Sequence, residues 1–339
     1  MLVLDGRTAL EYWMSDAAVM GRDHIGVSSA RLTDFDSLSC GNMSRRMDRL
    51  GARPGALELL VRNPDERRES DWVHSRAWGR HPLPHGSIVE VGDRVAVISP
   101  EICAIRLAAI LRPLPYFRAL CDLLGIYVRK SDDHFNLQER NPITSIEDIR
   151  TCLDQVGSIP GSKLARRALA WIVEGSASPR ETTMDVALAM PTRLGGHGLG
   201  DFKANWPIEL TASASGLTKR SYLVGDIVWE KEKLVVEYNS SKHHDKLEQK
   251  EMDLEKITAL QHMGYTVIPV STRQFSDFDV FKNVVVTIRQ HLGRRDRYAT
   301  SVYPKRYETH EALLRDELDR RIAPNLVETA RWQFLMAHM

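Results

Sequence analysis

The chain has 339 residues, of which 43% are hydrophobic and 27% charged, and its formal net charge is +1. These values are typical of soluble globular proteins and exclude disordered, collagen-like and coiled-coil chains, and the length suits about two domains of roughly 150 residues. Because the overall charge is close to zero, a nucleic-acid-binding function would depend on a local basic surface.

The sequence has none of the usual marks of a membrane or secreted protein. No apolar run reaches the ~18 residues that span a membrane, and the amino terminus lacks a basic segment followed by a long apolar stretch. The cysteines contain no C-x-x-C pair, which predicts reduced, buried thiols rather than a zinc site or disulfides. They are Cys40, Cys103, Cys121 and Cys152. We therefore expect a cytoplasmic protein without a membrane partner.

The first part of the chain mixes short predicted helices and strands. A helix is expected over residues 8–20, and strands over 88–91 and 94–98 flank a Gly-Asp turn typical of a hairpin. An apolar helix follows over 100–111, and the polar segment 62–80 is expected to be an exposed connection or an edge strand. This pattern predicts an α+β domain over residues 1–135.

The second part shows clearer periodicity. The predicted helices are 146–156, 163–174, 179–190, 246–263 and 278–292, and the predicted strands are 221–229, 234–238 and 265–270. Leu254, Ile257 and Leu260 are expected to share the buried face of one helix, and the glycine-rich segment 191–206 is expected to be a flexible loop. The predicted organisation is a helical connector at 136–176, an α/β domain at 177–293 and a basic tail of two short helices at 294–339.

Two acidic residues are expected to face one another across a hairpin. A turn that is symmetric about Lys231–Glu232 pairs Trp229 with Leu234 and places Asp226 opposite Glu237, with Cβ atoms ~5 Å apart. The neighbouring valines make the surroundings apolar; they are Val224, Val228 and Val235. Such a pair persists if a cation lies between the carboxylates or if one stays protonated, and Mg²⁺ prefers oxygen ligands of this kind. The alternative is that a bulge shifts the register and one acid points to solvent.

Polar residues follow the second strand directly. Asn239 shares the face of Glu237, and Lys242, His243 and His244 lie in the loop that leads to the next helix. A functional interpretation gives this loop proton transfer and phosphate contact. The alternative is a solvated loop without a chemical role.

These residues together resemble the PD-(D/E)XK nuclease superfamily. The order is a strand with Asp (GDIVW), a strand and loop (VVEYNSSKHH), a helix (EMDLEKITAL) and a strand (GYTVIPV), after an upstream helix SPRETTMDVAL. Within the superfamily the pattern is similar to the very-short-patch-repair-like endonuclease domain, over about residues 178–292. Residues 72–174 resemble, more weakly, abortive-infection (type IV) antitoxin-like regulators. The implied fold is α/β: a restriction-endonuclease-like mixed sheet flanked by helices, after the α+β amino-terminal domain.

The resemblance implies a set of site residues. It implies that Asp226 and Glu237 hold Mg²⁺ or Mn²⁺ with Glu181, that His244 acts on the attacking water, and that Asp253 and Lys256 flank the groove, where Asn239 would also contact DNA. Glu181 has a second interpretation, because Ser178, Pro179 and Glu181 match the pattern of a helix capping box.

Two departures from the family pattern involve Asn239. The signature lysine is replaced by Asn239, which carries no charge and takes no proton from water. The Asp-Gly pair that follows the glutamate in the family is Asn239–Ser240 here. Lys242 or Lys256 could supply the missing positive charge; loss of activity is the other explanation.

A basic segment follows the last predicted strand and helix. Arg294, Arg295 and Arg297 are followed by Tyr298 and Tyr303, a spacing that suits a nucleic-acid backbone. The alternative is a solvated tail.

The sequence therefore predicts a metal-dependent DNA endonuclease-like protein that hydrolyses phosphodiester bonds in DNA repair, phage defence or a toxin–antitoxin setting. DNA is the expected partner, with a protein partner or a second copy of the chain as a further one. The main alternative is a non-catalytic, DNA-binding regulator of antitoxin type with a decayed nuclease fold. A third hypothesis is a structural partner in a defence cassette.

Overall fold

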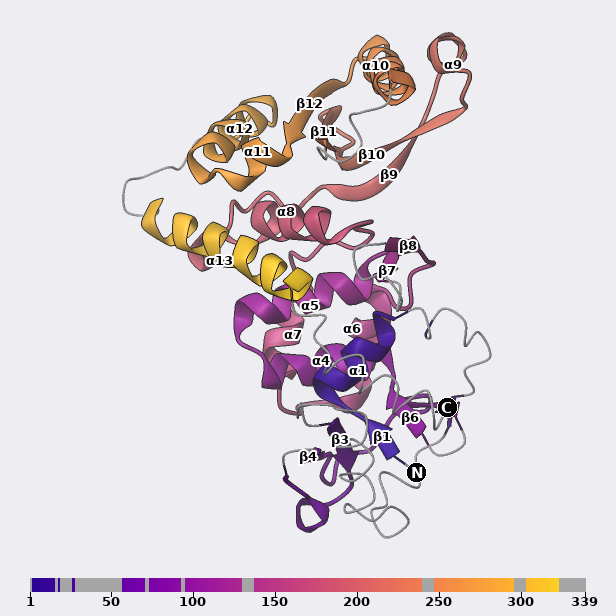
Figure 1. Cartoon of the computed structure of the whole chain (residues 1–339), viewed down its shortest axis with the longest axis vertical. Helices are drawn as coiled ribbons and strands as arrows, with labels where there is room; N and C mark the ends of the chain where they lie inside the picture. Colours follow the sequence, from indigo (N-terminus) through magenta and orange to yellow (C-terminus); the bar gives the residue numbers. More distant parts are fainter. Residues whose placement is uncertain are drawn as a thin grey trace. The chain divides into compact units, whose positions relative to one another are not determined.

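A computed structural model describes the chain over residues 2–15, 18, 26–27, 57–70, 73–92, 95–129, 137–239, 247–295 and 303–322. The described residues form a mixed α/β protein (Figure 1). The chain divides into two compact units. The first comprises Met1–Ala170 with Leu318–Met339, and the second comprises Trp171–Glu317.

The first unit is built on a six-stranded mixed sheet with the strand order β2-β5-β6-β1-β3-β4. Its strands are β1 (Leu2–Leu4), β2 (Gly26–Val27), β3 (Leu57–Val61), β4 (Val73–Ala77), β5 (Ile88–Gly92) and β6 (Val95–Ile98). Strands β1 and β6 run parallel, as do β3 and β4. Interior strands β3 and β6 are buried along their whole length. The continuous apolar run of β6 is typical of such a strand. The predicted β5–β6 hairpin and the predicted edge strand, β4, are confirmed.

Helix α4 lies at the centre of the helical layer of this unit. The helices are α1 (Gly6–Trp13), α4 (Pro100–Ile110), α5 (Pro113–Leu124), α6 (Ile146–Val156) and α7 (Ser162–Ala168), and α4 packs against each of the others. The Ser99 side chain caps α4 by accepting from the Ile102 N–H, and Pro100 fills its first position. Helices α1 and α7 end earlier than predicted. The polar segment after α5 contains a small hairpin of β7 (Tyr127–Arg129) and β8 (Leu137–Glu139).

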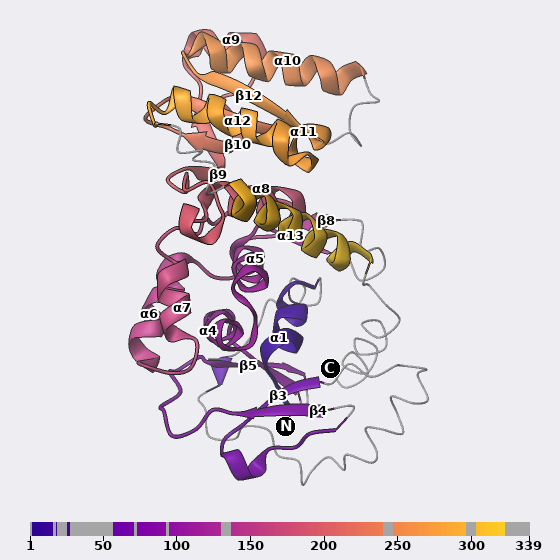
Figure 2. The same ribbon diagram turned by 90° about the vertical axis from the view of Figure 1, so that its left-hand side faces the viewer.

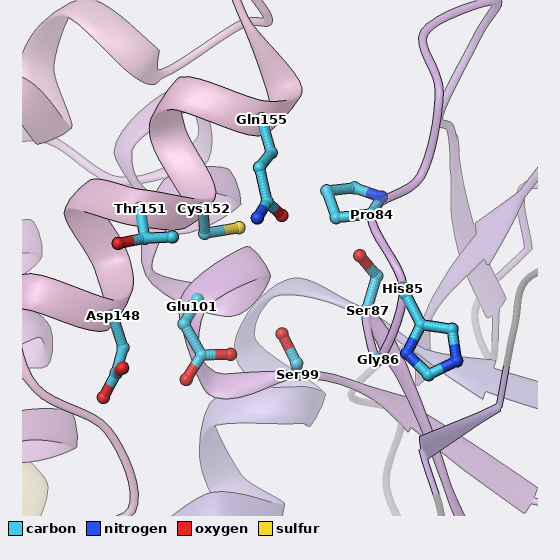
Figure 3. A pocket seen from close by; sticks show the side chains of 10 residues that line it. All are labelled: Pro84, His85, Gly86, Ser87, Ser99, Glu101, Asp148, Thr151, Cys152 and Gln155. Carbon is cyan, nitrogen blue, oxygen red and sulfur yellow. The ribbon is translucent and has the colours of Figure 1, made fainter.

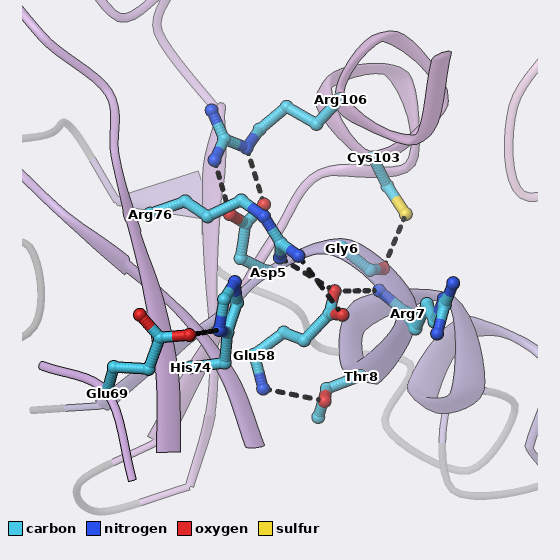
Figure 4. Close-up of polar contacts among 10 residues, drawn as sticks. All are labelled: Asp5, Gly6, Arg7, Thr8, Glu58, Glu69, His74, Arg76, Cys103 and Arg106. Carbon is cyan, nitrogen blue, oxygen red and sulfur yellow. Dashed lines mark hydrogen bonds and ion pairs between the residues drawn. The ribbon is translucent and has the colours of Figure 1, made fainter. Parts of the chain in front are cut away.

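Two acid–base pairs anchor the start of α1 (Figure 4). Asp5 is fully buried and accepts two hydrogen bonds of 2.5 Å from the Arg106 guanidinium. Glu58, on β3, accepts from the Arg7 N–H at 2.7 Å and pairs with Arg76 at 3.0 Å. Each buried carboxylate therefore meets a matched cation, and the cluster joins α1, α4, β3 and β4 as a structural network.

The second unit contains a four-stranded sheet with the order β12-β11-β10-β9. Its strands are β9 (Lys203–Glu209), β10 (Tyr222–Trp229), β11 (Leu234–Asn239) and β12 (Thr266–Ser271). Strands β9, β10 and β11 are antiparallel neighbours, and β12 runs parallel to β11. The prediction of a loop over 191–206 was wrong at its end, where β9 begins. Pro207 argues against a strand in the sequence, but β9 is an edge strand, where a sheet tolerates proline.

Figure 2 also shows the helices that precede and follow these strands in the chain. They are α8 (Pro179–Ala189), α9 (Ala212–Thr218), α10 (Leu247–His262), α11 (Thr272–Ser276), α12 (Phe278–His291) and α13 (Tyr303–Ile322). Helices α9 and α10 bury Ala214, Ala259 and Leu260 against the sheet. Leu254 is 64% exposed, which corrects the predicted buried face of α10. Over the described residues the tail forms one long helix, α13, rather than two short ones.

Glycines make the 195–200 segment a packed turn rather than the predicted flexible loop. A Cβ atom on Gly196 would lie 2.1 Å from the Met190 carbonyl oxygen, and one on Gly200 would lie 2.8 Å from the Trp171 carbonyl oxygen. His197, between them, is buried. Only glycine permits these close backbone approaches.

The described cysteines and helices agree with the sequence predictions about thiols and membrane segments. Cys103, Cys121 and Cys152 are buried free thiols, as expected, and Cys40 lies outside the described residues. No helix in the described ranges combines the length and the apolarity that a membrane crossing requires.

Candidate active site

The β10–β11 hairpin has the predicted register. Trp229 pairs with Leu234, Val228 with Val235 and Ile227 with Val236. The next position along the hairpin places Asp226 opposite Glu237. The backbone pairing of β10 with β11 ends before this position. A side-chain contact follows it, in which the Tyr238 N–H donates a 2.7 Å hydrogen bond to Asp226 Oδ2.

Both carboxyl groups of this pair are held in surroundings that disfavour charge. Burial raises the pKa of Asp226 well above its ordinary value, and the neighbouring charges of Glu237 and Glu181 raise it further. Burial also raises the pKa of Glu237, against the opposing influence of Lys256. Asp226 still keeps an intermediate share of its surface open to solvent, so a ligand can reach it.

The apolar shield predicted around the pair is incomplete. Val228 and Val235 are buried, whereas Val224 is 38% exposed. The pairing of β10 with β9 has a gap beside the acidic pair: Gly225 pairs with Trp206 and Ile227 with Ala204, but Asp226 and Asn205 between them do not pair.

Lys256 brings a positive charge to the pair from α10. Its Nζ atom lies 2.5 Å from Glu237 Oε2 in a largely buried ion pair. The second oxygen, Glu237 Oε1, is buried and has no hydrogen-bond partner among the described residues. Asp253, one turn earlier on α10, is half-buried and close enough to disfavour ionisation of Glu237. The structure thus brings together Asp226, Glu237 and Lys256, as the sequence predicted.

Glu181 caps α8 and also faces the acidic pair. Ser178 Oγ accepts from the Glu181 N–H at 3.2 Å and donates to Glu181 Oε1 at 2.8 Å. Glu181 Oε2 accepts from the Ala177 N–H at 3.0 Å and from Asn205 Nδ2 at 2.7 Å. The Ser178 half of the predicted capping box is therefore confirmed, whereas the Glu181 carboxylate bonds to the N–H of Ala177 rather than to that of Ser178. A role of Glu181 as metal ligand stays a prediction.

Sequence reasoning missed three polar residues behind the pair. Asp185, one turn after Glu181, is 1% exposed and accepts a 2.6 Å hydrogen bond from Ser176, while its Oδ1 atom has no hydrogen-bond partner in the part of the chain that the structure describes. Burial raises the pKa of Asp185 well above its ordinary value, and the charges of Glu181 and Asp226 add to this. The third residue is Asn205. The four-residue spacing from Glu181 was the available signal for Asp185, because such residues share a helix face.

The structure describes only some of the remaining predicted site residues. Asn239 is half-buried at the end of β11, where it pairs with Ser271. Lys242, His244 and Arg297 lie outside the described residues. Their predicted roles stay predictions.

The basic segment 289–306 directs much of its charge inward. Arg289 is buried and donates to the His197 carbonyl oxygen, and Arg306 is buried as well. Arg294 forms an ion pair with Asp201. Arg295 is exposed. Among the described members of the segment, Arg295 therefore offers its charge to solvent most directly.

The carboxylates can be tested for their fit to a divalent cation. In the described part of the chain, no three His, Cys, Asp or Glu side chains converge in an arrangement that holds a metal. Mg²⁺ commonly uses only one or two carboxylates, with waters and substrate phosphates completing its coordination. Asp226 and Glu237 supply oxygen ligands of the right type, and the unpartnered Glu237 Oε1 is a buried acceptor that lacks a donor. The residues present therefore fit such an ion.

A polar cavity of about 210 Å³ lies in the first unit (Figure 3). Loop 84–87, the start of α4 and one face of α6 line it, and its carboxylates are Glu101 and Asp148. Both occupy the first turn of a helix, where the helix dipole favours negative charge. The lining contains neither Lys nor Arg, so this cavity does not suit a nucleic-acid backbone.

Comparisons of the chain with models of protein families, with curated proteins and with solved structures returned no match.

Proposed function

We propose that the chain is a metal-dependent phosphodiesterase that acts on DNA through Asp226, Glu237 and Lys256. The observation that carries the proposal is the contact of the Lys256 ammonium with Glu237, beside Asp226. Two carboxylates from adjacent strands and a lysine from α10 suit phosphodiester hydrolysis with a divalent ion, because the acids can hold the ion and the lysine can stabilise phosphate charge.

The order of elements supports the same proposal. An acid-bearing helix, α8, precedes the Asp strand, β10, and the Glu strand, β11, and then come α10 and the parallel strand β12. This is the order in which the PD-(D/E)XK pattern places its helix acid, its two strand acids and its last helix and strand. Asn239 replaces the signature lysine, and Lys256 offers the charge from α10 instead.

Each residue has a defined part in this reaction. Asp226 and Glu237 would hold Mg²⁺ or Mn²⁺, which supplies polarisation of the phosphate and activation of water. Lys256 would stabilise the charge that develops on the phosphate oxygens in the transition state. Asn239 offers an amide and can contact phosphate, but it accepts no proton. His244 is proposed as the proton acceptor.

The test is a DNA cleavage assay in Mn²⁺ and in Mg²⁺. We expect the wild type to nick or cut DNA and Asp226→Ala to abolish cleavage while leaving DNA binding intact. Lys256→Met should lower the rate by ~10²-fold, since removal of one transition-state donor has that order of effect. Lys282→Met is the matched control, because Lys282 pairs with Asp279 on the surface of α12. If neither wild type nor Asn239→Lys cleaves DNA with either ion while both bind it, the proposal fails.

A second candidate function is a non-catalytic DNA-binding regulator. The ion pair between Lys256 and Glu237 favours it, because this contact neutralises the acid without a metal. In that case DNA binding should persist without cleavage. Replacement of Arg294, Arg295 and Arg297 together should then lower the slope of log K against log salt by ~0.9 for each lost phosphate contact. An unchanged slope would mean that these arginines make no phosphate contacts and that the tail is not part of the DNA-binding surface.

A further inference from the structure

We infer that Asn205 is a positioning residue of the proposed metal site: its amide holds Glu181 beside Asp226 and ties the segment before α8 to strand β9. This inference rests on the proposed function, because it assigns a residue to the same site. The chemistry concerned is the binding of a divalent cation by carboxylates.

The Asn205 amide joins two elements. Nδ2 donates a 2.7 Å hydrogen bond to Glu181 Oε2, on α8, and a 3.1 Å hydrogen bond to the Gly175 carbonyl oxygen. An amide NH₂ group has two donor hydrogens, so both are used. Glu181 thereby gains a donor from the sheet in addition to the donors of its own helix start.

The backbone of Asn205 is unusual for its place in the fold. Its φ is 45°, in the left-handed region, although it lies within strand β9. Lys219 and Lys233, the other non-glycine residues with φ in this region among those described, lie at the end of α9 and in the β10–β11 turn, where the chain reverses. No reversal explains the conformation of Asn205. Residues held in such conformations inside regular elements concentrate at functional sites.

The conformation of Asn205 has a direct structural consequence. The ladder between β9 and β10 is unpaired at Asn205 and Asp226, while Gly225–Trp206 and Ile227–Ala204 pair on either side. The left-handed backbone lies at this break, and its side chain contacts α8 rather than continuing the strand pattern. Asp226, Asn205 and Glu181 are therefore brought together at one point.

A second contact extends the same network. Ser176, next to Gly175, donates to the buried Asp185. A Cβ atom on Gly175 would lie 3.1 Å from the Ala204 carbonyl oxygen, so the segment runs close against β9. The hydrogen bonds of Asn205 to Gly175 and of Ser176 to Asp185 thus fix the segment that leads into α8, the helix that carries Glu181 and Asp185. Loss of such supporting contacts typically weakens metal binding by 10–100-fold.

The experiment compares the affinities of the full-length chain for Mn²⁺ by calorimetry. Asn205→Gly keeps the left-handed backbone accessible and removes only the amide. We expect its affinity for Mn²⁺ to fall by 10–100-fold. Lys219→Gly is the matched control, because it changes a left-handed residue at the end of α9, and its affinity should equal that of the wild type.

The outcomes separate the inference from the proposed function. If the wild type binds no Mn²⁺, the metal site of the proposed function fails and the inference fails with it. If the wild type and Asn205→Gly bind equally, the inference alone is overturned. Should Asn205→Gly not fold, Glu181→Gln decides, because it leaves the β9 backbone unchanged and removes the charge that Asn205 positions. Wild-type affinity in Glu181→Gln would overturn the inference.

Discussion

Divalent ions should stabilise the protein, and Glu237→Gln should remove this effect. Asp226 and Glu237 are both acceptors, and the one nearby cation, Lys256, contacts a single oxygen of the pair among the described residues. An ion bound only in the folded state shifts the folding equilibrium by mass action. The amide of the Glu237→Gln variant keeps the shape of the side chain but lacks the charge that would hold the ion.

The size of the effect follows from ligand linkage. An ion at 100 times its dissociation constant stabilises the folded state by about 2.7 kcal/mol. In a unit of about 150 residues, such as 171–317, each kcal/mol raises the thermal midpoint by roughly 2–4 °C. The wild type should therefore gain about 5–10 °C at saturating Mg²⁺ or Mn²⁺.

The pH dependence gives an independent check on the same pair. Their pKa values are raised in the folded state. Without metal, the stability that this contributes is present below the ordinary carboxyl pKa and is lost as the pH rises through the raised values. Because protons compete with the ion for the same oxygens, stabilisation by metal should instead grow with pH across this range.

The assay is a thermal melt at several ion concentrations and pH values. The control is Glu230→Gln, because Glu230 is an exposed acid that pairs with Lys203 at 2.7 Å away from the pair. The control should keep the full shift. An equal shift in wild type and Glu237→Gln would refute the paired-carboxylate site.

Three further predictions concern the packing of each unit. Burial lowers the pKa of His310 from 6.5 to about 4. The free energy of unfolding should therefore fall by about 3 kcal/mol as the pH drops from 6.5 to 4. Chemical unfolding of His310→Gln should show a weaker dependence on pH. Asp5→Ala should cost about 3–5 kcal/mol in the same assay, because it leaves the Arg106 charge buried without its partner; a loss below 1 kcal/mol would contradict this account. Gly225→Ala places a Cβ atom 2.6 Å from Val228 Cγ2 and should lower the free energy of unfolding by about 1–3 kcal/mol. An unchanged thermal melt would contradict this prediction.

The hairpin of the site was predictable because its signals are local. Apolar residues flank a short charged turn on both sides, so the turn fixes the register, and with it the opposition of Asp226 and Glu237. The start of α8 was predictable for the same reason, since Ser178 and Glu181 are three residues apart. Both features depend on residues that are close together in the sequence.

The other half of the site depends on contacts between distant residues. Asn205 and Glu181 are 24 residues apart and lie on different elements, and no periodic pattern links them. The prediction for α10 shows a related difficulty. Leu254 suggested one buried face, but the helix presents Lys256 to Glu237 and leaves Leu254 exposed. The rotation of a helix is decided by its packing, which residue spacing alone does not determine.

The basic segment gives a third example. Its composition favours a nucleic-acid surface, yet Arg289 and Arg306 are buried in the second unit. Long arginine side chains can contribute to packing and bond to carbonyl oxygens in the interior. A count of charges therefore does not distinguish arginines that face DNA from arginines that hold helices together.

Lys256 and Asn239 allow the origin of the positive charge to be tested. Asn239 occupies the signature lysine position on β11, two residues after Glu237, whereas Lys256 reaches Glu237 from α10. If the site requires only a cation near the two acids, Asn239→Lys should restore part of the activity that Lys256→Met loses. A double-mutant cycle on the cleavage rate would then show strong non-additivity. If the double variant folds and binds Mn²⁺ but cleaves no faster than Lys256→Met, Lys256 acts by holding Glu237 in place, and charge at the signature position does not replace it.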